Sequence, residues 1–348
     1  MPAIRYPAPL APGDVVGVTS PSSGVEAPLR PRLDVALRRV RSAGYEVRVG
    51  DCMDGARHVS APARERAAEF QAMLLDPAVR AIVPPWGGET AIDLIDLLDW
   101  EAVAAAEPTW VVGFSDIATL LTPLTLLTGV ATIHGNNLMD TPYAAPDGLL
   151  DWLDVVAAPR GATLTQRPPG RWREGFVDYA ANPEDDRYDL DRPGGWVRLD
   201  TAGGEGPGAP LDVSGRLIGG CIETLANLAG TRFLDTSGLR AAAGREGLLV
   251  YVEAAGDDAP TICRNLHGMR LAGFFEGARA VLIGRTAAPD HATLTQHEAA
   301  YDALHRLGVP LLADVECGHV APYLALVNGA RTRVLHGGGR TQVTQTLS

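Results

Sequence analysis

The most informative absence in this sequence is lysine. All 30 basic residues of the 348-residue chain are arginine. Schiff-base catalysis, a Ser–Lys dyad, the P-loop lysine and the lysine of the protein-kinase ATP site all require a lysine side chain, so each of these chemistries is excluded. Any general base in this protein must be another kind of side chain.

Cysteine is also scarce, and long apolar runs are missing. The four cysteines, Cys52, Cys221, Cys263 and Cys317, are widely spaced and form no C-x-x-C pair, so neither a zinc site nor a disulfide framework is indicated. No run approaches about 18 apolar residues, and the first residues lack a basic segment followed by an apolar core. We therefore expect no membrane span, no secretory signal and a cytoplasmic protein with reduced thiols.

The charge balance is acidic, with a formal net charge of −12. A surface of this sign repels nucleic acid and anionic membranes, so we expect neither as a partner. Hydrophobic residues make up 46% of the chain, which is enough to bury two cores in a protein of this length.

Short apolar runs alternate with helix-patterned segments in the first half of the chain. Residues 14–21 and 81–86 have the pattern of strands that end in polar or glycine-rich loops, while residues 60–77 and 90–100 have helical spacing. Strands that alternate with helices predict βαβ units and a mostly parallel sheet, with ligands at the carboxyl ends of the strands. The predicted fold class is α/β.

The alternating pattern breaks down between about residues 161 and 210, where proline, glycine and acidic residues dominate. A segment this long without periodicity is either a linker or a functional loop. Strand and helix signals resume after it and indicate a second α/β domain. We therefore divide the chain into an N-terminal domain (1–165), a connecting loop that is a candidate for substrate recognition (166–210) and a C-terminal domain (211–348).

One strand-to-helix joint carries a serine, in the stretch "TWVVGFSDIATLLTPLTLLTG". A sharp turn at Ser115 would lift its hydroxyl clear of the sheet, beside the free N–H groups of a helix N-terminus, as a nucleophile requires. The motif is not the α/β-hydrolase elbow, because Ile117 stands where G-x-S-x-G requires glycine. Ser115 and Asp116 are also favoured N-cap residues, and the local sequence alone favours capping.

Other residues with useful chemistry also follow strands. Gly87 and Gly88 permit close backbone approach, so one N–H could donate to an oxyanion, although an ordinary tight turn explains the pair equally well. Glu253 and His319 end or follow apolar runs, where catalytic residues are often found. Ser115, Glu253 and His319 would make an acceptable Ser–Glu–His triad, but their spacing does not show that they meet.

The remaining histidines do not indicate a metal site. His134 follows a strand and could line a pocket, and His291 has the surroundings of a loop or cap. Five histidines are interpreted as surface residues: His58, His267, His297, His305 and His336. No H-x-x-x-H or H-E-x-x-H spacing is present, so we predict no metal ligands.

Several ordered segments together resemble the LD-carboxypeptidase family of serine peptidases, and within it the branch of the microcin C immunity peptidases. These segments are "GVTSPSSG", "PPWGGE", "VVGFSDIATLL" with the family pattern G-[FYH]-S-D, "GRLIGGCIETLANLAGT", "LLVYVEAA" and "LLADVECGHVAPYLALVNGARTRV". They occur in the order expected for the family and span nearly the whole chain.

The resemblance implies an architecture and a set of roles. The architecture is a Rossmann-like N-terminal domain and a smaller C-terminal α/β domain, with the active site in the cleft between them. Ser115 is implied as the nucleophile, His319 as the general base and Glu253 as the residue that orients it. The amides of Gly88 and Asp116 are implied as the oxyanion hole. Members need no metal or cofactor and are commonly homodimers.

The implied activity is that of a metal-independent serine carboxypeptidase-type hydrolase, which cleaves an amide bond near the C-terminus of a small peptide-like substrate. That substrate would be a murein L,D-peptide or a peptidyl or aminoacyl nucleotide antibiotic of the microcin C type, which suggests peptidoglycan recycling or antibiotic resistance. The alternative from another class is a non-catalytic two-domain binding protein that holds a small ligand in the same cleft.

The sequence departs from the family pattern in two places. Cys221 stands where the commonest pattern has asparagine after paired glycines. In the microcin branch, tryptophans of a connecting loop stack on the nucleotide. The corresponding region here holds five aromatic residues: Trp172, Phe176, Tyr179, Tyr188 and Trp196. Its acidic run at 184–186 would oppose a phosphate unless it points away.

Overall fold

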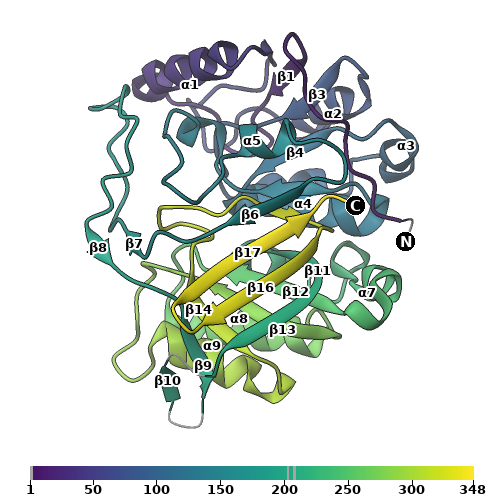
Figure 1. Ribbon diagram of the computed structural model, residues 1–348. Helices are drawn as coiled ribbons and strands as arrows, with labels where there is room; N and C mark the ends of the chain where they lie inside the picture. The colour runs from purple at the N-terminus through teal and green to yellow at the C-terminus, as the bar shows by residue number, and fades with distance from the viewer. Residues whose placement is uncertain (1–2, 202–203, 207–208) are drawn as a thin grey trace.

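The computed structural model describes residues 3–201, 204–206 and 209–348. Two large β-sheets, drawn one above the other in Figure 1, organise these residues, and helices pack against both. Residues 202–203 and 207–208 of the predicted connecting loop lie outside the described part. Among the described residues, no helix combines the length and the apolar character that crossing a membrane requires.

The first sheet has six strands and is parallel except at one edge. In spatial order its strands are β15 (Leu326–Asn328), β5 (Thr132–His134), β4 (Trp110–Gly113), β3 (Val79–Ile82), β1 (Val15–Val18) and β2 (Glu46–Val49). Only β15 pairs antiparallel, with β5. The main helices that accompany these strands are α1 (Arg30–Ser42), α2 (Ala63–Leu75), α3 (Trp100–Ala105) and α4 (Ala118–Thr128). The predicted parallel α/β arrangement is confirmed.

The second sheet has nine strands around a parallel centre. In spatial order they are β10 (Gly204–Gly206), β9 (Val197–Thr201), β14 (Leu311–Val315), β13 (Ala278–Gly284), β12 (Leu248–Glu253), β11 (Leu211–Cys221), β16 (Arg331–Gly337), β17 (Arg340–Thr346) and β6 (Thr163–Gln166). The strands from β11 to β14 pair in parallel. Their helices are α6 (Ile222–Leu225), α7 (Ser237–Ala243), α8 (Ala259–Leu271) and α9 (Gln296–Leu304). The predicted second α/β unit is therefore present.

The remaining elements are short. They comprise α5 (Trp152–Val156), the ribbon of β7 (Arg171–Trp172) and β8 (Arg192–Pro193), and the 3₁₀ helices η1 (Ala27–Leu29), η2 (Ala91–Leu94), η3 (Ser115–Ile117), η4 (Leu138–Asp140), η5 (Ala226–Leu228), η6 (Arg232–Leu234), η7 (Gly244–Glu246) and η8 (His305–Leu307). The helix predicted over 90–100 is thus divided between η2 and α3. The division has a local cause, because the Asp99 carboxylate accepts a hydrogen bond from the Ala102 amide at 2.9 Å and starts a new helix there.

Each sheet contains a strand from the other part of the chain. β15 follows most strands of the second sheet in sequence, yet it forms the edge of the first sheet. Conversely, β6 precedes the second sheet in sequence and pairs with its last strand, β17, as the teal and yellow arrows in Figure 1 show. The two sheets are therefore tied by more than one crossing of the chain. The domain limits 1–165, 166–210 and 211–348 stay a prediction.

Helix α4 lies between the two sheets and fixes the joint that precedes it. Nearly all of its side chains are buried, as its apolar sequence requires. The Thr122 hydroxyl donates to the carbonyl oxygen of Gly219 on β11 at 2.6 Å, which links the helix to the second sheet. Gly129 ends the helix with a φ of 74°, a left-handed conformation that suits glycine. The N-terminus of α4 is consequently held where both sheets approach each other.

Candidate active site

Ser115 occupies the sharp turn between β4 and α4. Its φ of 63° is in the left-handed region, which costs a non-glycine residue about 1–3 kcal/mol and is often found at functional positions. The turn is supported by Asn137, whose Oδ1 accepts a hydrogen bond from the Phe114 amide at 3.2 Å. A Cβ on Gly113 would lie 2.8 Å from the same oxygen, so only glycine fits at the end of the strand. Sequence reasoning missed Asn137, because its partner is remote in the chain.

The capping interpretation of Ser115 and Asp116 is wrong. The helix turns that begin here have Phe114 and Ile117 at their N-caps, and neither end receives a side-chain cap. The Asp116 carboxylate instead accepts hydrogen bonds from the Ser22 hydroxyl at 2.6 Å and from the Ala91 amide at 2.8 Å. Asp116 therefore ties the serine turn to two neighbouring loops.

Three residues predicted from separate segments meet at this turn. His319 Nε2 lies 2.9 Å from Ser115 Oγ, and His319 Nδ1 lies 2.8 Å from Glu253 Oε2. Glu253 ends β12 and is fully buried, while His319 lies in the loop after β14. The serine comes from the first sheet, and the other two residues come from the second. The contact between the two sheets is therefore what assembles this hydrogen-bonded chain.

Glu253 and His319 each favour the charged form of the other. Burial alone would raise the pKa of Glu253, but the charge and hydrogen bond of His319 outweigh it and lower that pKa below its usual range. Burial would likewise lower the pKa of His319, yet the Glu253 carboxylate raises it above the usual histidine value. Each group thus stabilises the charge on the other. A ring in this setting readily accepts a proton at Nε2, which is the nitrogen that faces Ser115.

Glycines allow the backbone to pass close to the three hydrogen-bonded residues Ser115, His319 and Glu253. At Gly318, with a φ of 100°, a Cβ would lie 2.3 Å from Glu253 Oε2. At Gly87, a Cβ would lie 2.9 Å from the Asp116 amide nitrogen and 3.0 Å from Ser115 Oγ. Gly88 has a φ of 139°, which a side chain rarely adopts. The pair predicted from "PPWGGE" therefore borders the serine directly.

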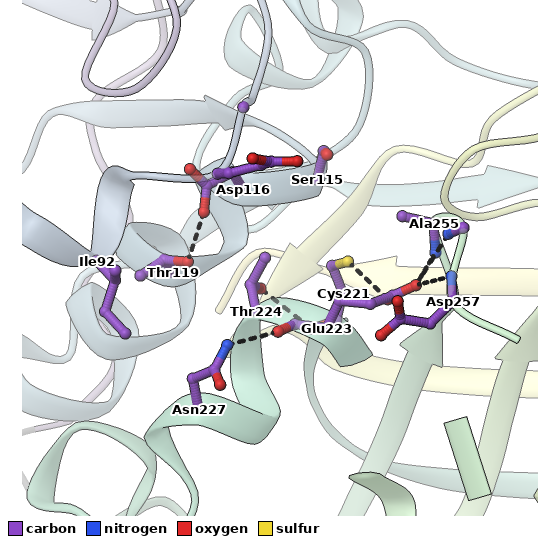
Figure 2. A pocket seen from close by; sticks show the side chains of 13 residues that line it. Ile92, Ser115, Asp116, Thr119, Cys221, Glu223, Thr224, Asn227, Ala255 and Asp257 are labelled. Atoms are coloured by element: carbon purple, nitrogen blue, oxygen red, sulfur yellow. Dashed lines mark hydrogen bonds between the residues drawn. The ribbon is translucent and has the colours of Figure 1, made fainter. Parts of the chain in front are cut away.

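Two cavities meet at Ser115. The first has a volume of about 440 Å³ and is drawn in Figure 2, where Ser115 and Asp116 lie on one side and Cys221, Glu223 and Asp257 on the other. The second has a volume of about 420 Å³, and its lining includes His319, Trp86 and Arg57. Gly88 and Ser115 line both cavities.

The carboxylates of the first cavity are organised by the loop that follows β12. Glu223 Oε1 accepts hydrogen bonds from the backbone amides of Ala255, Gly256 and Asp257 at 2.7, 3.0 and 3.2 Å. Partial burial raises the pKa of Asp257, and the nearby charges of Glu223 and Asp258 raise it further. No arginine or histidine is among the described residues that line this cavity.

Cys221 lines the first cavity at the position where the family pattern has asparagine. Its side chain is buried, and its thiol donates to Glu223 Oε2 at 3.2 Å. Burial raises the pKa of this thiol well above its usual value, and the carboxylates of Glu253 and Glu223 add to that effect. Cys221 is therefore a protonated, unreactive thiol beside the serine, not a second nucleophile.

The five aromatic residues of the connecting loop have separate environments. Tyr188 stacks on Tyr143 with ring centroids 4.5 Å apart, and Tyr179 donates to Asp140 Oδ1 at 2.6 Å. Trp196 is buried, Trp172 lies beside a guanidinium, and Phe176 is 68% exposed. By contrast, Trp86 of the "PPWGGE" segment lines the second cavity. Sequence reasoning treated this segment as a glycine turn and missed its tryptophan as a possible stacking surface.

The acidic run at 184–186 is engaged with other side chains. Glu184 pairs with Arg38 at 2.7 Å, and Asp185 accepts a hydrogen bond from the Tyr143 hydroxyl at 3.0 Å. Asp186 lies 3.8 Å from Arg187. None of the three is among the described residues that line either cavity at Ser115.

Two histidines that do not belong to the hydrogen-bonded group of Ser115, His319 and Glu253 are buried. The His134 ring makes edge-on contacts with Phe114 and Tyr251, and burial lowers its pKa to about 4, so it is a neutral core residue. His336, interpreted from sequence as a surface residue, is only 8% exposed and stacks on Trp196. Among the described residues, one group has donor atoms spaced as in a metal site. It lies elsewhere and consists of Cys263, His267 and Asp302.

Comparison with known proteins supports a family assignment. The model of the LD-carboxypeptidase N-terminal domain matches residues 16–135, and that of the LD-carboxypeptidase C-terminal domain matches residues 214–334. A putative carboxypeptidase of Streptomyces coelicolor is 32% identical over 90% of this chain and 87% of its own length. The microcin C7 self-immunity protein MccF of Escherichia coli is 24% identical over 94% of this chain and 92% of its own.

Solved structures share the same fold. The microcin C7 self-immunity protein MccF in its wild-type apo state superposes with a TM-score of 0.79 at 20% identity, covering 98% of each chain. An MccF-like protein from Bacillus anthracis has a TM-score of 0.78 at 21% identity, covering 98% of this chain and 99% of its own. Both family models match, and the relatives align over most of their own length. The chain belongs to the LD-carboxypeptidase family of serine peptidases.

Proposed function

We propose that this protein is a metal-independent serine carboxypeptidase-type hydrolase in which Ser115, His319 and Glu253 form the catalytic triad. The observation that carries the proposal is the unbroken hydrogen-bonded chain from Ser115 Oγ through the His319 ring to Glu253 Oε2. A buried carboxylate that orients a histidine, which in turn contacts a serine displayed on a strained turn, is the arrangement that nucleophilic acyl transfer requires.

Each proton in the proposed reaction has a donor and an acceptor. His319 Nε2 takes the Ser115 hydroxyl proton as Oγ attacks the carbonyl carbon of the scissile amide. Glu253 stabilises the imidazolium that forms. The same proton then passes from Nε2 to the leaving amine, the C–N bond breaks, and an acyl-enzyme ester remains on Ser115. Water repeats the sequence, and the carboxylic acid leaves.

The negative charge that develops on the carbonyl oxygen needs donors beside Ser115. The backbone amides of Gly88 and Asp116 are the proposed donors, because the glycine pair lies against the serine turn without an intervening Cβ. Preorganised backbone amides are effective here because they need no reorientation during the reaction. Substitution of Gly87 would place a methyl group against both the Asp116 amide and Ser115 Oγ.

The position of His319 distinguishes the two cavities. The leaving amine must receive its proton from His319 Nε2, so the leaving group occupies the second cavity, which His319 lines. The acyl part of the substrate then occupies the first cavity, across Ser115. We therefore refer to the acyl-side cavity and the leaving-side cavity.

The acyl-side cavity favours a substrate whose acyl residue carries an amino group. Glu223 and Asp257 are carboxylates in its lining, and no cation is among the described residues there. A diamino acid, such as murein peptides contain, complements this charge. MccF structures are known in complex with aspartyl sulfamoyl adenosine and glutamyl sulfamoyl guanosine, in which the acyl residue is acidic. The charge of this cavity favours a murein-type peptide over such compounds.

A homodimer, which the family resemblance implies, and a cytoplasmic location, which the sequence composition indicates, stay predictions.

The decisive experiment offers the protein a murein tetrapeptide and an aminoacyl sulfamoyl adenosine side by side. Ser115→Ala should lower turnover of the better substrate by on the order of 10³-fold or more, because the nucleophile is lost. Ser214→Ala, at an exposed serine of β11, is the matched control and should leave turnover unchanged. Binding of either compound without turnover by the folded protein would instead favour the non-catalytic binding protein. Unchanged turnover by the Ser115 variant would end the proposed mechanism.

A further inference from the structure

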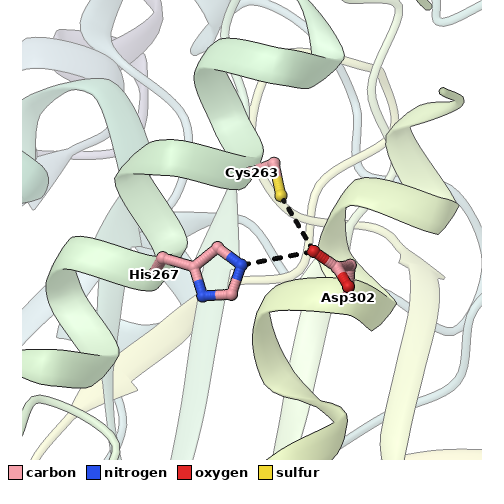
Figure 3. A group of neighbouring side chains, drawn as sticks. All are labelled: Cys263, His267 and Asp302. Atoms are coloured by element: carbon pink, nitrogen blue, oxygen red, sulfur yellow. Dashed lines mark hydrogen bonds and ion pairs between the residues drawn. The ribbon is translucent and has the colours of Figure 1, made fainter.

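Three metal-ligating side chains meet between α8 and α9, and none of them lines either cavity at Ser115. Cys263 and His267 are four residues apart on α8 and therefore lie on one face of that helix. Asp302 is on α9, which packs beside α8. Figure 3 shows the thiol, the imidazole and the carboxylate directed toward one another across the gap between the two helices.

The spacing of the donor atoms fits a tetrahedral zinc ion. Cys263 Sγ lies 3.6 Å from Asp302 Oδ2, and His267 Nε2 lies 3.3 Å from the same oxygen. Zinc binds sulfur at about 2.3 Å and nitrogen or oxygen at about 2.0–2.2 Å, so tetrahedral angles place the sulfur about 3.5 Å and the nitrogen about 3.3 Å from the oxygen. The three donor atoms lie within 4.8 Å of one another, so a modest closure of the side chains brings all three within reach of one ion.

The kind of donor selects the kind of metal. A thiolate and an imidazole are poor ligands for magnesium or calcium, which prefer oxygen, whereas zinc accepts sulfur, nitrogen and carboxylate oxygen together. We propose that Cys263, His267 and Asp302 form a zinc site whose fourth position is open to water. This site is independent of the proposed hydrolase chemistry, which uses none of these residues.

Metal binding removes the Cys263 thiol proton, moves the His267 ring proton and displaces the Arg270 guanidinium. The Cys263 thiol proton is released to solvent, and the neutral His267 ring must carry its proton on Nδ1 so that Nε2 can bind the ion. Arg270 Nη2 now lies 3.2 Å from His267 Nδ1, where it donates to the ring, and Arg270 Nε donates to the Ala303 carbonyl at 2.9 Å. The guanidinium must turn away from the ring when zinc binds. Arg270 therefore opposes the metal.

The expected consequence of occupancy is a tie between α8 and α9. Zinc that binds the folded chain and not the unfolded one stabilises the folded state in proportion to its concentration over its dissociation constant. The loop that precedes α8 carries Ala255, Gly256 and Asp257 of the acyl-side cavity. The tie thus steadies α8, the helix into which that loop leads, without placing the metal in the cavity.

The test measures metal binding to the whole chain after treatment with a chelator. Zinc titrated against a chromophoric chelator should bind with a stoichiometry of one, and cobalt in its place should give the near-ultraviolet band of a thiolate–cobalt bond. Cys263→Ser and His267→Gln should each weaken binding by about tenfold or more, and Cys263→Ser should abolish the cobalt band. Arg270→Gln should tighten binding, an effect that a merely structural cluster would not produce.

His291→Gln is the matched control, because His291 is an exposed histidine outside the cluster. Its zinc affinity should equal that of the unmodified chain. The melting temperature of each variant without metal shows whether it folds, and zinc should raise that temperature in the unmodified chain but not in the Cys263 variant. The proposal is overturned if the unmodified chain binds no stoichiometric zinc, or if the Cys263 and His267 variants bind it equally well.

Discussion

The acyl-side and leaving-side cavities share a wall but differ in character. Glu223 and Asp257 line the acyl-side cavity, whereas Trp86, Arg57 and His319 line the leaving-side cavity. One side therefore offers carboxylates and backbone amides, and the other offers an aromatic ring and a guanidinium. In the proposed mechanism, residues that line both cavities should affect every substrate, while residues that line only one should select the part of the substrate on that side.

The residues proposed for the chemistry and those proposed for substrate specificity are held in place by different parts of the molecule. Ser115 is held by the turn into α4, which is buried between both sheets, so its position depends on the whole fold. Glu223 is held by three amides of a single loop, and Trp86 follows a single strand. A change at a locally held residue should alter selectivity and leave the proposed triad intact. Substitutions can therefore test the two properties independently.

The largest effect is expected at Glu253, which lines neither cavity and acts through its hydrogen bond with His319. Glu253→Gln keeps the size of the side chain but removes the charge that orients and stabilises the His319 imidazolium. Turnover should fall by on the order of 10³–10⁴-fold for every substrate, with little change in KM or in the preference among substrates. Steady-state kinetics on two substrates that differ in acyl residue would check this. A loss confined to one substrate would show that Glu253 contributes to substrate binding, and would contradict its proposed role in the chemistry of every substrate.

The pH profile gives the same residue a second test. His319 must be neutral to accept the serine proton, and Glu253 raises its pKa above the usual histidine value. The rate constant kcat/KM should therefore fall as the pH drops through that raised pKa. In Glu253→Gln the carboxylate charge is gone and burial lowers the pKa, so the acidic limb should move to lower pH. An acidic limb that stays in place would show that another group controls it.

An intermediate effect is expected at Trp86, on the leaving side alone. Base–aromatic stacking contributes roughly 1–3 kcal/mol, so Trp86→Ala should lower kcat/KM for an aminoacyl nucleoside by about tenfold. Hydrolysis of a peptide with a small D-amino acid leaving group should change far less. Trp86→Phe keeps an aromatic face and loses the hydrogen bond from Nε1 to the Gly24 carbonyl, so it should retain most of the activity. Equal losses for both leaving groups would indicate that Trp86 supports the loop and not the ligand.

Local sequence located the strand, the glycine and the helix that flank Ser115, because all three are neighbours in the chain. It favoured a capping role for Ser115 and Asp116, however, and that interpretation is wrong. The meeting of Ser115 with Glu253 and His319 depends on the packing of α4 against the second sheet, which no local pattern records. Family resemblance supplied that link in advance, since it compares the whole chain at once.

Other features were hidden by the same limitation. β9 lies within the segment that lacked periodicity, because only five residues form it and its partner β14 is more than a hundred residues away. The metal-ligand group was partly visible, since Cys263 and His267 have the C-x-x-x-H spacing of one helix face. Its third member, Asp302, is on another helix, and the paired-histidine motifs of zinc sites do not include this spacing.

The smallest effect, and the sharpest test of the comparison, is expected at Asp257. Its carboxylate is partly solvated, and its pKa is raised by burial and by Glu223 and Asp258. Asp257→Asn should therefore reduce kcat/KM for a lysyl substrate by only about fivefold, as expected for one unit charge near solvent. A glutamyl substrate should improve by a similar factor, and a norleucyl substrate should not change.

Asp212→Asn, at an exposed carboxylate of β11 that pairs with Arg333 and lines neither cavity, is the matched control for Asp257→Asn. It should alter none of the three substrates. The opposite signs for lysyl and glutamyl substrates are the essential result, because general damage to the site would lower both. If kcat/KM falls for both the lysyl and the glutamyl substrate, the acyl-side cavity does not select by charge, and the preference for a murein-type peptide loses its basis. If they diverge, the side of Ser115 that holds the acyl residue is fixed by the same measurement, since Asp257 lines the acyl-side cavity and His319 does not.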